Sequence, residues 1–522
     1  MKTRANYVGR RENRRRWRQG LPLVGGLLVL SGCATPESVR ESVYSSRQKA
    51  HEQWAAQRGA ERNALPELSG RLTLEDAIKV ALTYNKPLQA VMQDRDVARG
   101  RVLESYGEAL PKVSAAADYT RLDEVSGFNV GGQNVSLGQL DNYSADLTVR
   151  QPIFRGGAID AALQSARLYE YLTEESVREQ VQATIFEVAN AYNSALLAQH
   201  LLDVYREAVR SAEAHLRDVE KKLGQGLASR FDVLRAEVDV SNFKAEMIQQ
   251  QNRLNLARTR LWKVMGVSQE TDVALAGELM YEAVEPVFED VVRVAHLNRP
   301  DLYRAELAVR LQEQAVRVAR SAYWPRLDAT FTQGWARPDP HASTKDEWGD
   351  SWVAGVELEL PLFDGLARKG RLVQERAILE RRRIERKDAE ERVLLDIQQA
   401  LLALRDAAEF VESQRLNLDR AQEGLRLAEV GYQQGIHTEV AIADARAALT
   451  QARGLYYQSI YDHTSARIAL QRAMGVLGPG REDAGLAAPG MDNIPNAADL
   501  TPNDTHVEPI PPKAGEHEED AE

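Results

Sequence analysis

Residue types that most often carry chemistry are sparse in this sequence of 522 residues, which has one cysteine and nine histidines. No two histidines stand at a metal-ligand spacing beside a carboxylate, and His437 is interpreted as an exposed residue at a helix turn. Gly224-Gln225-Gly226 follows a predicted helix instead of a strand, so it does not fit a dinucleotide loop. Neither a Gly-x-Ser-x-Gly motif nor a Walker loop occurs. These observations predict a protein that is not an enzyme and holds no metal or organic cofactor.

One residue, Cys33, has a specific predicted chemistry. Residues 10–18 are rich in arginine, residues 21–30 are apolar, and Leu30-Ser31-Gly32-Cys33 follows. This order is typical of a signal peptide ending at a cleavage site, and it resembles the bacterial lipobox, which implies diacylglycerol and palmitate on the cysteine. The alternative is a chance cysteine after an ordinary signal, which is weakened because the chain has no other cysteine. Ala34 resembles the pattern of lipoproteins sorted to the outer membrane.

The chain is organised around a hinge that occurs twice. Before each copy, residues alternate between apolar and polar as in a strand, and after it comes a long proline-free run with helical spacing. The copies are Gln151-Pro152-Ile153-Phe154-Arg155-Gly156-Gly157 and Leu360-Pro361-Leu362-Phe363-Asp364-Gly365. Pro152 and Pro361 are 209 residues apart, as are Gly226 and Gly435. The sequence therefore predicts a tandem duplication, each copy reading helix, strand, loop, strand, very long helix, turn, helix.

Strands are expected at residues 113–121, 142–151, 326–336 and 351–360, each with an apolar and a polar face. Their length suits a tilted membrane strand. Four of the seven tryptophans (Trp324, Trp335, Trp348, Trp352) lie at the ends of the second pair, where an aromatic girdle would sit. The alternative is an ordinary antiparallel sheet with one face in water. Four strands cannot close a barrel and open edges are not tolerated in lipid, so several chains would have to share one barrel.

The polar face of these strands is expected to line the barrel lumen. Its charged residues are Asp118, Asp146, Arg150, Asp328, Glu357 and Glu359. Because five carboxylates stand against one arginine, we expect a lumen that prefers cations. Residues 123–142 and 337–350 would form loops outside the cell.

Two runs at residues 156–265 and 366–474 are expected to form very long helices that turn back on themselves. A helix of about 65 residues reaches roughly 100 Å, more than a compact domain needs. A plain coiled coil is the alternative, but the attached strand pair favours a tunnel wall anchored in a membrane at one end. In both turns, glycine and then Ser229 or Thr438 can end one helix and cap the next.

Several motifs together resemble those of the TolC-like outer-membrane factors, over about residues 71–476. They are Leu72-Thr73-Leu74-Glu75-Asp76-Ala77, Asn298-Arg299-Pro300-Asp301-Leu302, both hinges and residues 226–236. The resemblance implies a homotrimer with a twelve-stranded barrel in the Gram-negative outer membrane and an α-helical tunnel in the periplasm. It also implies a passive exit duct that meets a periplasmic adaptor and an inner-membrane transporter of the RND or ABC type.

The same resemblance implies roles for residues at the turns. Family members close the periplasmic mouth with aspartates, whose matching positions here are Asp444 and Ala441, with Asp232 and Arg235 in the first copy. The alanine leaves Asp444, paired with Arg235, as the candidate gate. Surface charges on exposed helix ends are the alternative. The implied adaptor contacts are Gly226, Ser229, Gly435 and Thr438.

The expected organisation has six parts. They are a signal peptide (1–32), a lipidated tether (33–70), a first repeat (71–266), a linker (267–288), a second repeat (289–476) and an acidic disordered tail (477–522). The net charge of −11 argues against nucleic-acid binding. Export of small molecules by a tripartite pump is the preferred function. The alternatives are type I protein secretion and a lipid-anchored periplasmic coiled-coil scaffold without a pore.

Overall fold

The computed structural model describes residues 36–57, 70–125, 127–130, 133–136, 138–271, 273–342 and 346–478. The chain divides into two units, residues 1–69 and 70–522. In the first, the helix α1 (Pro36–Gln57) lies within the expected tether. Cys33 and residues 479–522 lie outside the described residues.

The second unit contains the predicted tandem repeat. Its first copy comprises α2 (Leu74–Tyr84), α3 (Lys86–Met92), α4 (Asp94–Gly107), β2 (Lys112–Arg121), β5 (Asp141–Phe154), α5 (Ala158–Gly224) and α6 (Arg230–Met265). The second comprises α7 (Phe288–Asn298), α8 (Pro300–Ser321), β7 (Arg326–Arg337), β8 (Gly349–Glu359), α9 (Ala367–Gln433) and α10 (Glu439–Ala473). The helices α5 and α9 are each 67 residues long. None of the described helices is long and apolar enough to cross a membrane.

Two smaller strand pairs were not expected from the sequence. The hairpin β3 (Gly127–Val130) and β4 (Gln133–Ser136) forms inside the predicted outer loop. The parallel pair β1 (Arg71–Leu72) and β6 (Ala274–Leu275) joins the start of the first repeat to the linker. The hydroxyl of Tyr192 on α5 donates to the carbonyl of Leu72 at 2.8 Å, which holds this pair against the long helix.

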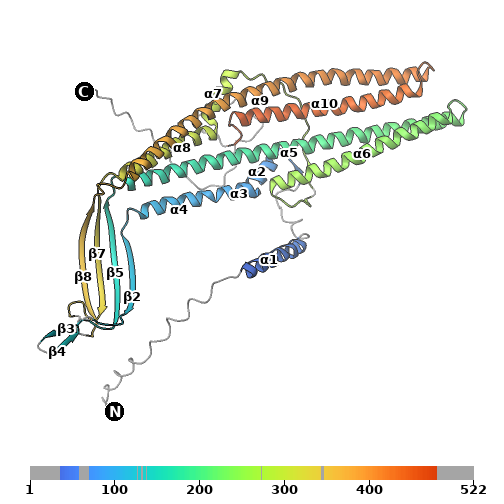
Figure 1. Ribbon diagram of the computed structural model, residues 1–522. Coiled ribbons are helices and arrows are strands. Elements are labelled where there is room, and N and C mark those ends of the chain that lie inside the picture. The colour runs from blue at the N-terminus through green and yellow to red at the C-terminus, as the bar shows by residue number, and fades with distance from the viewer. Residues whose placement is uncertain are drawn as a thin grey trace, which may run out of the picture. The chain divides into compact units, whose positions relative to one another are not determined.

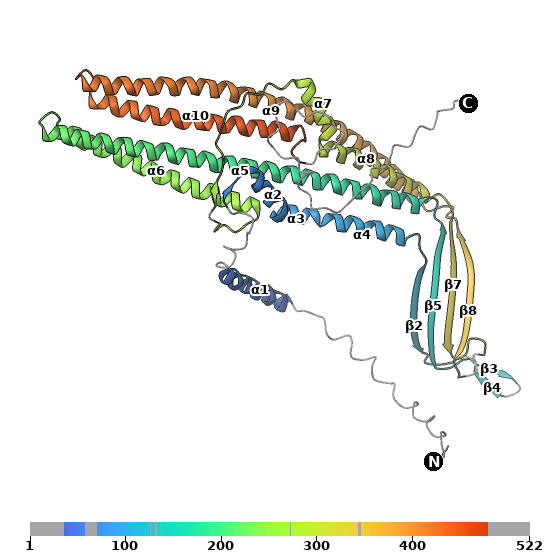
Figure 2. The same cartoon turned by 180° about the vertical axis from the view of Figure 1, so that it is seen from behind.

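The main sheet is antiparallel and has the order β2-β5-β7-β8. Figure 1 shows it at one end of the long helices, and Figure 2 shows the same arrangement from behind. Directly paired residues share a face of a sheet. Ala115 pairs with Leu147 on the predicted apolar face, and Asp328 pairs with Glu357 on the predicted polar face. Among the described residues, no strand pairs with the outer edge of β2 or of β8.

The helical core is unequally distributed between the two repeats. Twenty residues of α5 are buried against seven of α9, although the helices have the same length. The cause is the number of neighbouring helices, because α5 contacts α2, α3, α4, α6, α8 and α10, whereas α9 contacts α7, α8 and α10. Each repeat closes at a glycine, and Gly266 and Gly475 both have positive φ values. A Cβ at Gly475 would lie 2.8 Å from the backbone nitrogen of Arg299, so only glycine fits there.

Candidate functional site

The six charged residues predicted for the lumen lie on one face of the main sheet, as the register requires. Asp328 differs from the other five because its side chain is only 5% exposed. Its carboxylate accepts from Arg150 Nη2 at 2.9 Å and from Arg155 Nη2 at 2.7 Å. Arg155 stands in the first hinge, directly after β5, and was not among the predicted site residues.

This pairing changes the predicted charge of the polar face. Because Asp328 is held by two arginines, its negative charge is compensated inside the sheet. Glu357 lies 3.7 Å from the guanidinium of Arg150 but is itself 64% exposed. An excess of negative charge on this face therefore depends on Asp118, Asp146, Glu357 and Glu359, which stand against Lys112 and Arg326 on the same face. Their position in a lumen remains a prediction.

The first hinge fixes how the sheet joins the helices. Gly156 has a φ of +61°, and a Cβ there would lie 2.6 Å from Cβ of Trp324 and 2.7 Å from the carbonyl of Ser321. The end of α8 therefore packs directly onto the first hinge. At the second hinge, Leu362 and Phe363 are 87% and 80% exposed because β8 is an edge strand.

The two helical turns are built alike. Gly226 and Gly435 have φ values of +73° and +74°, which favour glycine at the end of a helix. Ser229 caps α6: its hydroxyl accepts from the Asp232 amide at 3.2 Å, and its own amide donates to the Asp232 carboxylate at 2.8 Å. Thr438 precedes α10 in the same extended conformation without a side-chain cap. Contact of these residues with an adaptor remains a prediction.

The predicted gate residues have different surroundings. Asp232 is bound in the Ser229 cap, and these hydrogen bonds lower the pKa of its carboxyl group. Arg235 lies beside Asp239 in the same helix. Asp444 is exposed on α10, so any ring that it forms requires further copies of the chain. The pairing of Asp444 with Arg235 remains a prediction about an assembly.

Near the turns, a cluster of buried and half-buried polar side chains joins the two repeats, and no sequence pattern indicated it. We call it the tip cluster: His215 on α5, Asp239 on α6, Tyr432 on α9, and Glu439 and Arg446 on α10. His215 and Glu439 form an ion pair across 224 residues of sequence. Burial, first of all, and the nearby Glu439 raise the pKa of Tyr432 to about 12.

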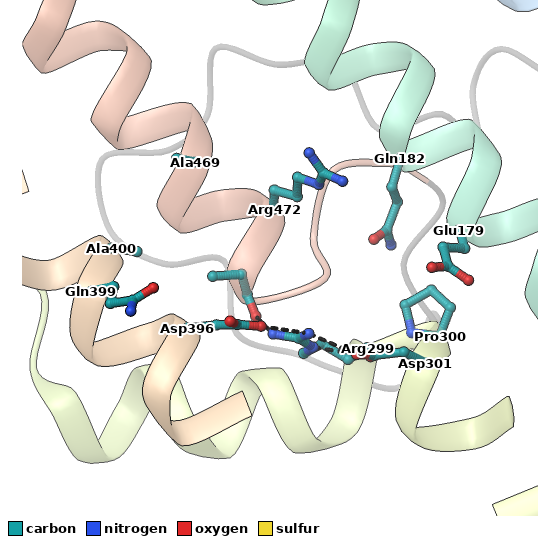
Figure 3. Close-up of a pocket in the computed structure, with 11 residues that line it drawn as sticks. Glu179, Gln182, Arg299, Pro300, Asp301, Asp396, Gln399, Ala400, Ala469 and Arg472 are labelled. Atoms are coloured by element: carbon teal, nitrogen blue, oxygen red, sulfur yellow. Dashed lines mark hydrogen bonds and ion pairs between the residues drawn. The ribbon is translucent and has the colours of Figure 1, made fainter. Parts of the chain in front are cut away.

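A crevice of about 470 Å³ lies between α5, α8, α9 and α10 (Figure 3). Arg299 crosses its floor and binds Asp301 at 2.7 Å and Asp396 at 2.9 Å. The guanidinium is thus occupied by two carboxylates from neighbouring helices, as the dashed lines show. The crevice joins the repeats structurally. In the described part of the chain, no group of three or more His, Cys, Asp or Glu residues could hold a metal ion.

Comparison with known proteins agrees with this geometry. A family model described as outer membrane efflux protein matches residues 77–267 and 291–476. The toluene efflux pump outer membrane protein TtgC of Pseudomonas putida is 23% identical over 77% of this chain and 82% of its own length. The alkaline protease secretion protein AprF of Pseudomonas aeruginosa is 23% identical over 78% and 85%. The outer membrane protein VceC of Vibrio cholerae is 18% identical over 77% and 96%, with a TM-score of 0.65.

Each strand pair has one polar and one apolar face and leads into a pair of very long helices. This combination defines the class of outer-membrane channels with a periplasmic tunnel. The chain belongs to the outer membrane efflux protein family. It is an exit duct in the outer membrane of a Gram-negative bacterium and extends into the periplasm. The predicted family, fold class and outer-membrane location are confirmed, whereas lipid anchoring remains a prediction.

Proposed function

We propose that this chain forms a homotrimeric exit duct, anchored by lipid on Cys33, that passes small molecules from an inner-membrane transporter and a periplasmic adaptor to the exterior. One observation carries the proposal: a four-stranded sheet with an apolar and a polar face is open at both β2 and β8. An open edge within lipid leaves backbone groups unsatisfied, so β8 of one copy has to pair with β2 of the next. Three copies supply twelve strands, enough to close a barrel.

An exposed apolar stripe on α9 supports the same assembly. Its members are Leu366, directly before the helix, and, within the helix, Val373, Ile384, Leu395, Leu402, Leu416 and Leu427, each between 45% and 64% exposed. Their spacings of 7, 11 and 14 residues keep them on one side of a helix. The stripe starts at the hinge after the open strand β8, so it continues the same unpartnered flank.

The opposite flank carries a second set of exposed apolar residues. Figures 1 and 2 show α4 and α6 on one side of α5, with α8, α9 and α10 on the other. On α4 and α6 the exposed apolar residues are Val97, Leu103, Tyr106, Phe231, Leu234, Val238, Ile248 and Leu256. Because α4 leads directly into β2, this set belongs to the other open edge. Two different apolar flanks fit a ring in which each copy meets the next head to tail.

Small-molecule export is favoured over protein secretion because TtgC and several other relatives are efflux pump outer membrane proteins. Protein secretion is the second candidate because AprF, a secretion protein, matches over a similar share of the chain. A scaffold without a pore is disfavoured, because it has no use for exposed Phe331 and Trp352 on one sheet face.

Deletion of the gene in its own host tests whether the channel exports small molecules or secretes a protein. We expect the mutant to become more sensitive to organic solvents and antibiotics and to accumulate a fluorescent dye, with its secreted proteins unchanged. Complementation with the wild-type gene should restore export, and the Cys33→Ser variant should restore less because it cannot be lipidated. Normal export with loss of one secreted protein would establish the secretion alternative instead.

A further inference from the structure

The helix α1 carries apolar side chains along one side. Since an α-helix takes about 3.6 residues per turn, residues four or seven positions apart return to nearly the same side. Four residues of α1 follow this spacing, and we call them the α1 face: Val39, Val43, Ala50 and Trp54. The side chains of Val39, Val43 and Trp54 are 49%, 55% and 55% exposed. The α1 face therefore offers an apolar surface to a partner.

The charged residues of α1 are sorted by side. Arg40 and Arg47 lie along one border of the α1 face, and Lys49 lies along the other. Glu41 and Glu52 lie on the opposite side of the helix, about 170° from the middle of the α1 face. Long basic side chains can lay their methylene groups on apolar surface and keep their charge in water. The α1 face is thus bordered by cations and turned away from these carboxylates.

Hydroxyl groups near the α1 face find their hydrogen-bond partners inside the helix. The Oγ of Ser46 donates to the carbonyl of Val43 at 2.8 Å, and that of Ser42 donates to the carbonyl of Val39 at 2.7 Å. A hydroxyl that is hydrogen-bonded in this way costs little when it leaves water. On the opposite side, Gln48 Nε2 donates to the carboxylate of Glu52 at 3.2 Å. One side of α1 is therefore suited to an apolar environment and the other to water.

The sequence places α1 next to the predicted lipid anchor. Pro36, the first residue of the helix, follows Cys33 by three residues. Three residues span at most ~11 Å, so lipid on Cys33 puts the start of α1 beside the headgroups of the leaflet that holds the lipid. Tryptophan, which the α1 face contains as Trp54, is enriched at membrane interfaces. A membrane surface is therefore within reach of the α1 face.

We propose that α1 lies in the plane of the outer membrane on its periplasmic leaflet, with the α1 face among the upper acyl chains and Arg40, Arg47 and Lys49 on lipid phosphates. Interfacial helices combine an apolar face with bordering cations in this way. A lipid surface fits better than an acidic or apolar protein surface, because it supplies apolar chains and phosphates together. The proposal rests on the proposed function, since lipid on Cys33 brings α1 to the leaflet. It goes further by giving residues 36–57 a binding partner of their own.

Fluorescence quenching on the full-length trimer in phospholipid vesicles tests this placement. A polarity-sensitive dye is attached to one new cysteine, either Val43→Cys in the α1 face or Gln48→Cys on the opposite side as the matched control. We expect lipids with a doxyl quencher on their acyl chains to quench the dye several-fold more strongly in Val43→Cys, because only that side enters the apolar region. Equal quenching in the two variants would overturn the proposal. A blue-shifted Val43→Cys dye that lipid does not quench would overturn it as well, because the α1 face would then pack against protein.

The bordering cations give a second reading. With the dye in the α1 face, quenching should increase when phosphatidylglycerol is added to phosphatidylcholine vesicles and should fall at high salt, because anionic headgroups attract basic side chains. The combined change Arg40→Gln, Arg47→Gln and Lys49→Gln should abolish this dependence. The control is Glu41→Gln with Glu52→Gln, which should keep it. A dependence on phosphatidylglycerol that survives in the cation variant contradicts the proposed contacts with phosphate.

Reaction of the dye with the wild-type chain separates this proposal from lipid anchoring. Cys33 is the only cysteine, so a wild-type protein that takes up dye has a free thiol and contradicts lipid on Cys33. Val43→Cys and Gln48→Cys are then compared in the Cys33→Ser background. Stronger quenching of Val43→Cys there supports an interfacial α1 that needs no lipid, whereas equal quenching overturns both proposals. A wild type that takes up no dye, combined with equal quenching in the two variants, overturns the placement of α1 alone.

Discussion

At the scale of single residues, the role of a charged side chain depends on the groups that the fold places beside it. Asp328 and Arg155 show this at the base of the sheet, where a carboxylate read as part of the lumen is held by two arginines. Asp232 shows it at the turn, where a candidate gate residue serves as a helix cap. Asp444 stays exposed and available.

Asp328→Asn is expected to lower the stability of the protein by about 2 kcal/mol, because it removes a buried charge between two arginines of which Arg150 is half exposed. The measurement is the temperature at which the purified assembly dissociates in detergent. Glu359→Gln, an exposed carboxylate on the same sheet face, is the matched control and should change little. Equal dissociation temperatures of the two variants would mean that the buried pair stabilises the assembly no more than an exposed carboxylate does.

Asp444→Ala is expected to raise single-channel conductance or the leak of small solutes, because it removes a negative side chain from the start of α10. The measurement is planar-bilayer recording. Asp462→Ala, a change further along the same helix, controls for loss of a carboxylate in general. Unchanged conductance in Asp444→Ala would remove this residue from the gate.

At the scale of elements, the pattern of apolar residues predicted the strands, the faces and the long helices, because each of these depends on local periodicity. The hinge motif predicted where strand becomes helix. Contacts such as His215 with Glu439 could not be predicted, since no sequence pattern reports a pairing across 224 residues. The β3-β4 hairpin was missed because its strands are only four residues long.

The start of α6 should respond to acid through Asp232. Hydrogen bonds from Ser229 lower the pKa of this carboxyl group below its unfolded value. Its stabilising effect is therefore present above the unfolded pKa and is lost as the pH falls through the folded one. We expect hydrogen exchange at residues 230–235 to quicken on acidification, by an amount near the ~1 kcal/mol of a helix cap. Ser229→Ala should give faster exchange at neutral pH and a weaker dependence on acid; an unaltered acid response in that variant would contradict the cap.

At the scale of the whole molecule, the two repeats are alike in elements and unlike in burial. The helix α5 has twenty buried residues, whereas α9 has seven and borders an open flank with an apolar stripe. This asymmetry was not predicted, because the equal lengths and repeated motifs of the two copies say nothing about which one lies at an edge. It follows from strand order, which places β5 inside the sheet and β8 outside.

The stripe predicts how the assembly can be broken. Leu395→Arg combined with Leu402→Arg should prevent trimer formation, because each places a charge at a position that another copy would bury. Mass determination of the purified protein in detergent is the measurement. Gln414→Arg, which lies off the stripe on the same helix, is the control and should remain trimeric. A trimer that survives the double change would exclude this face of α9 from the subunit interface.

The most direct test of an exit duct is planar-bilayer conductance of the purified mature protein, with its mass in detergent measured on the same sample. A trimer that gives small, cation-preferring current steps is the expected result, because the carboxylates of Asp118, Asp146, Glu357 and Glu359 outnumber Lys112 and Arg326 on the polar face of each sheet. A water-soluble species that gives no current after its lipid is removed would contradict the channel.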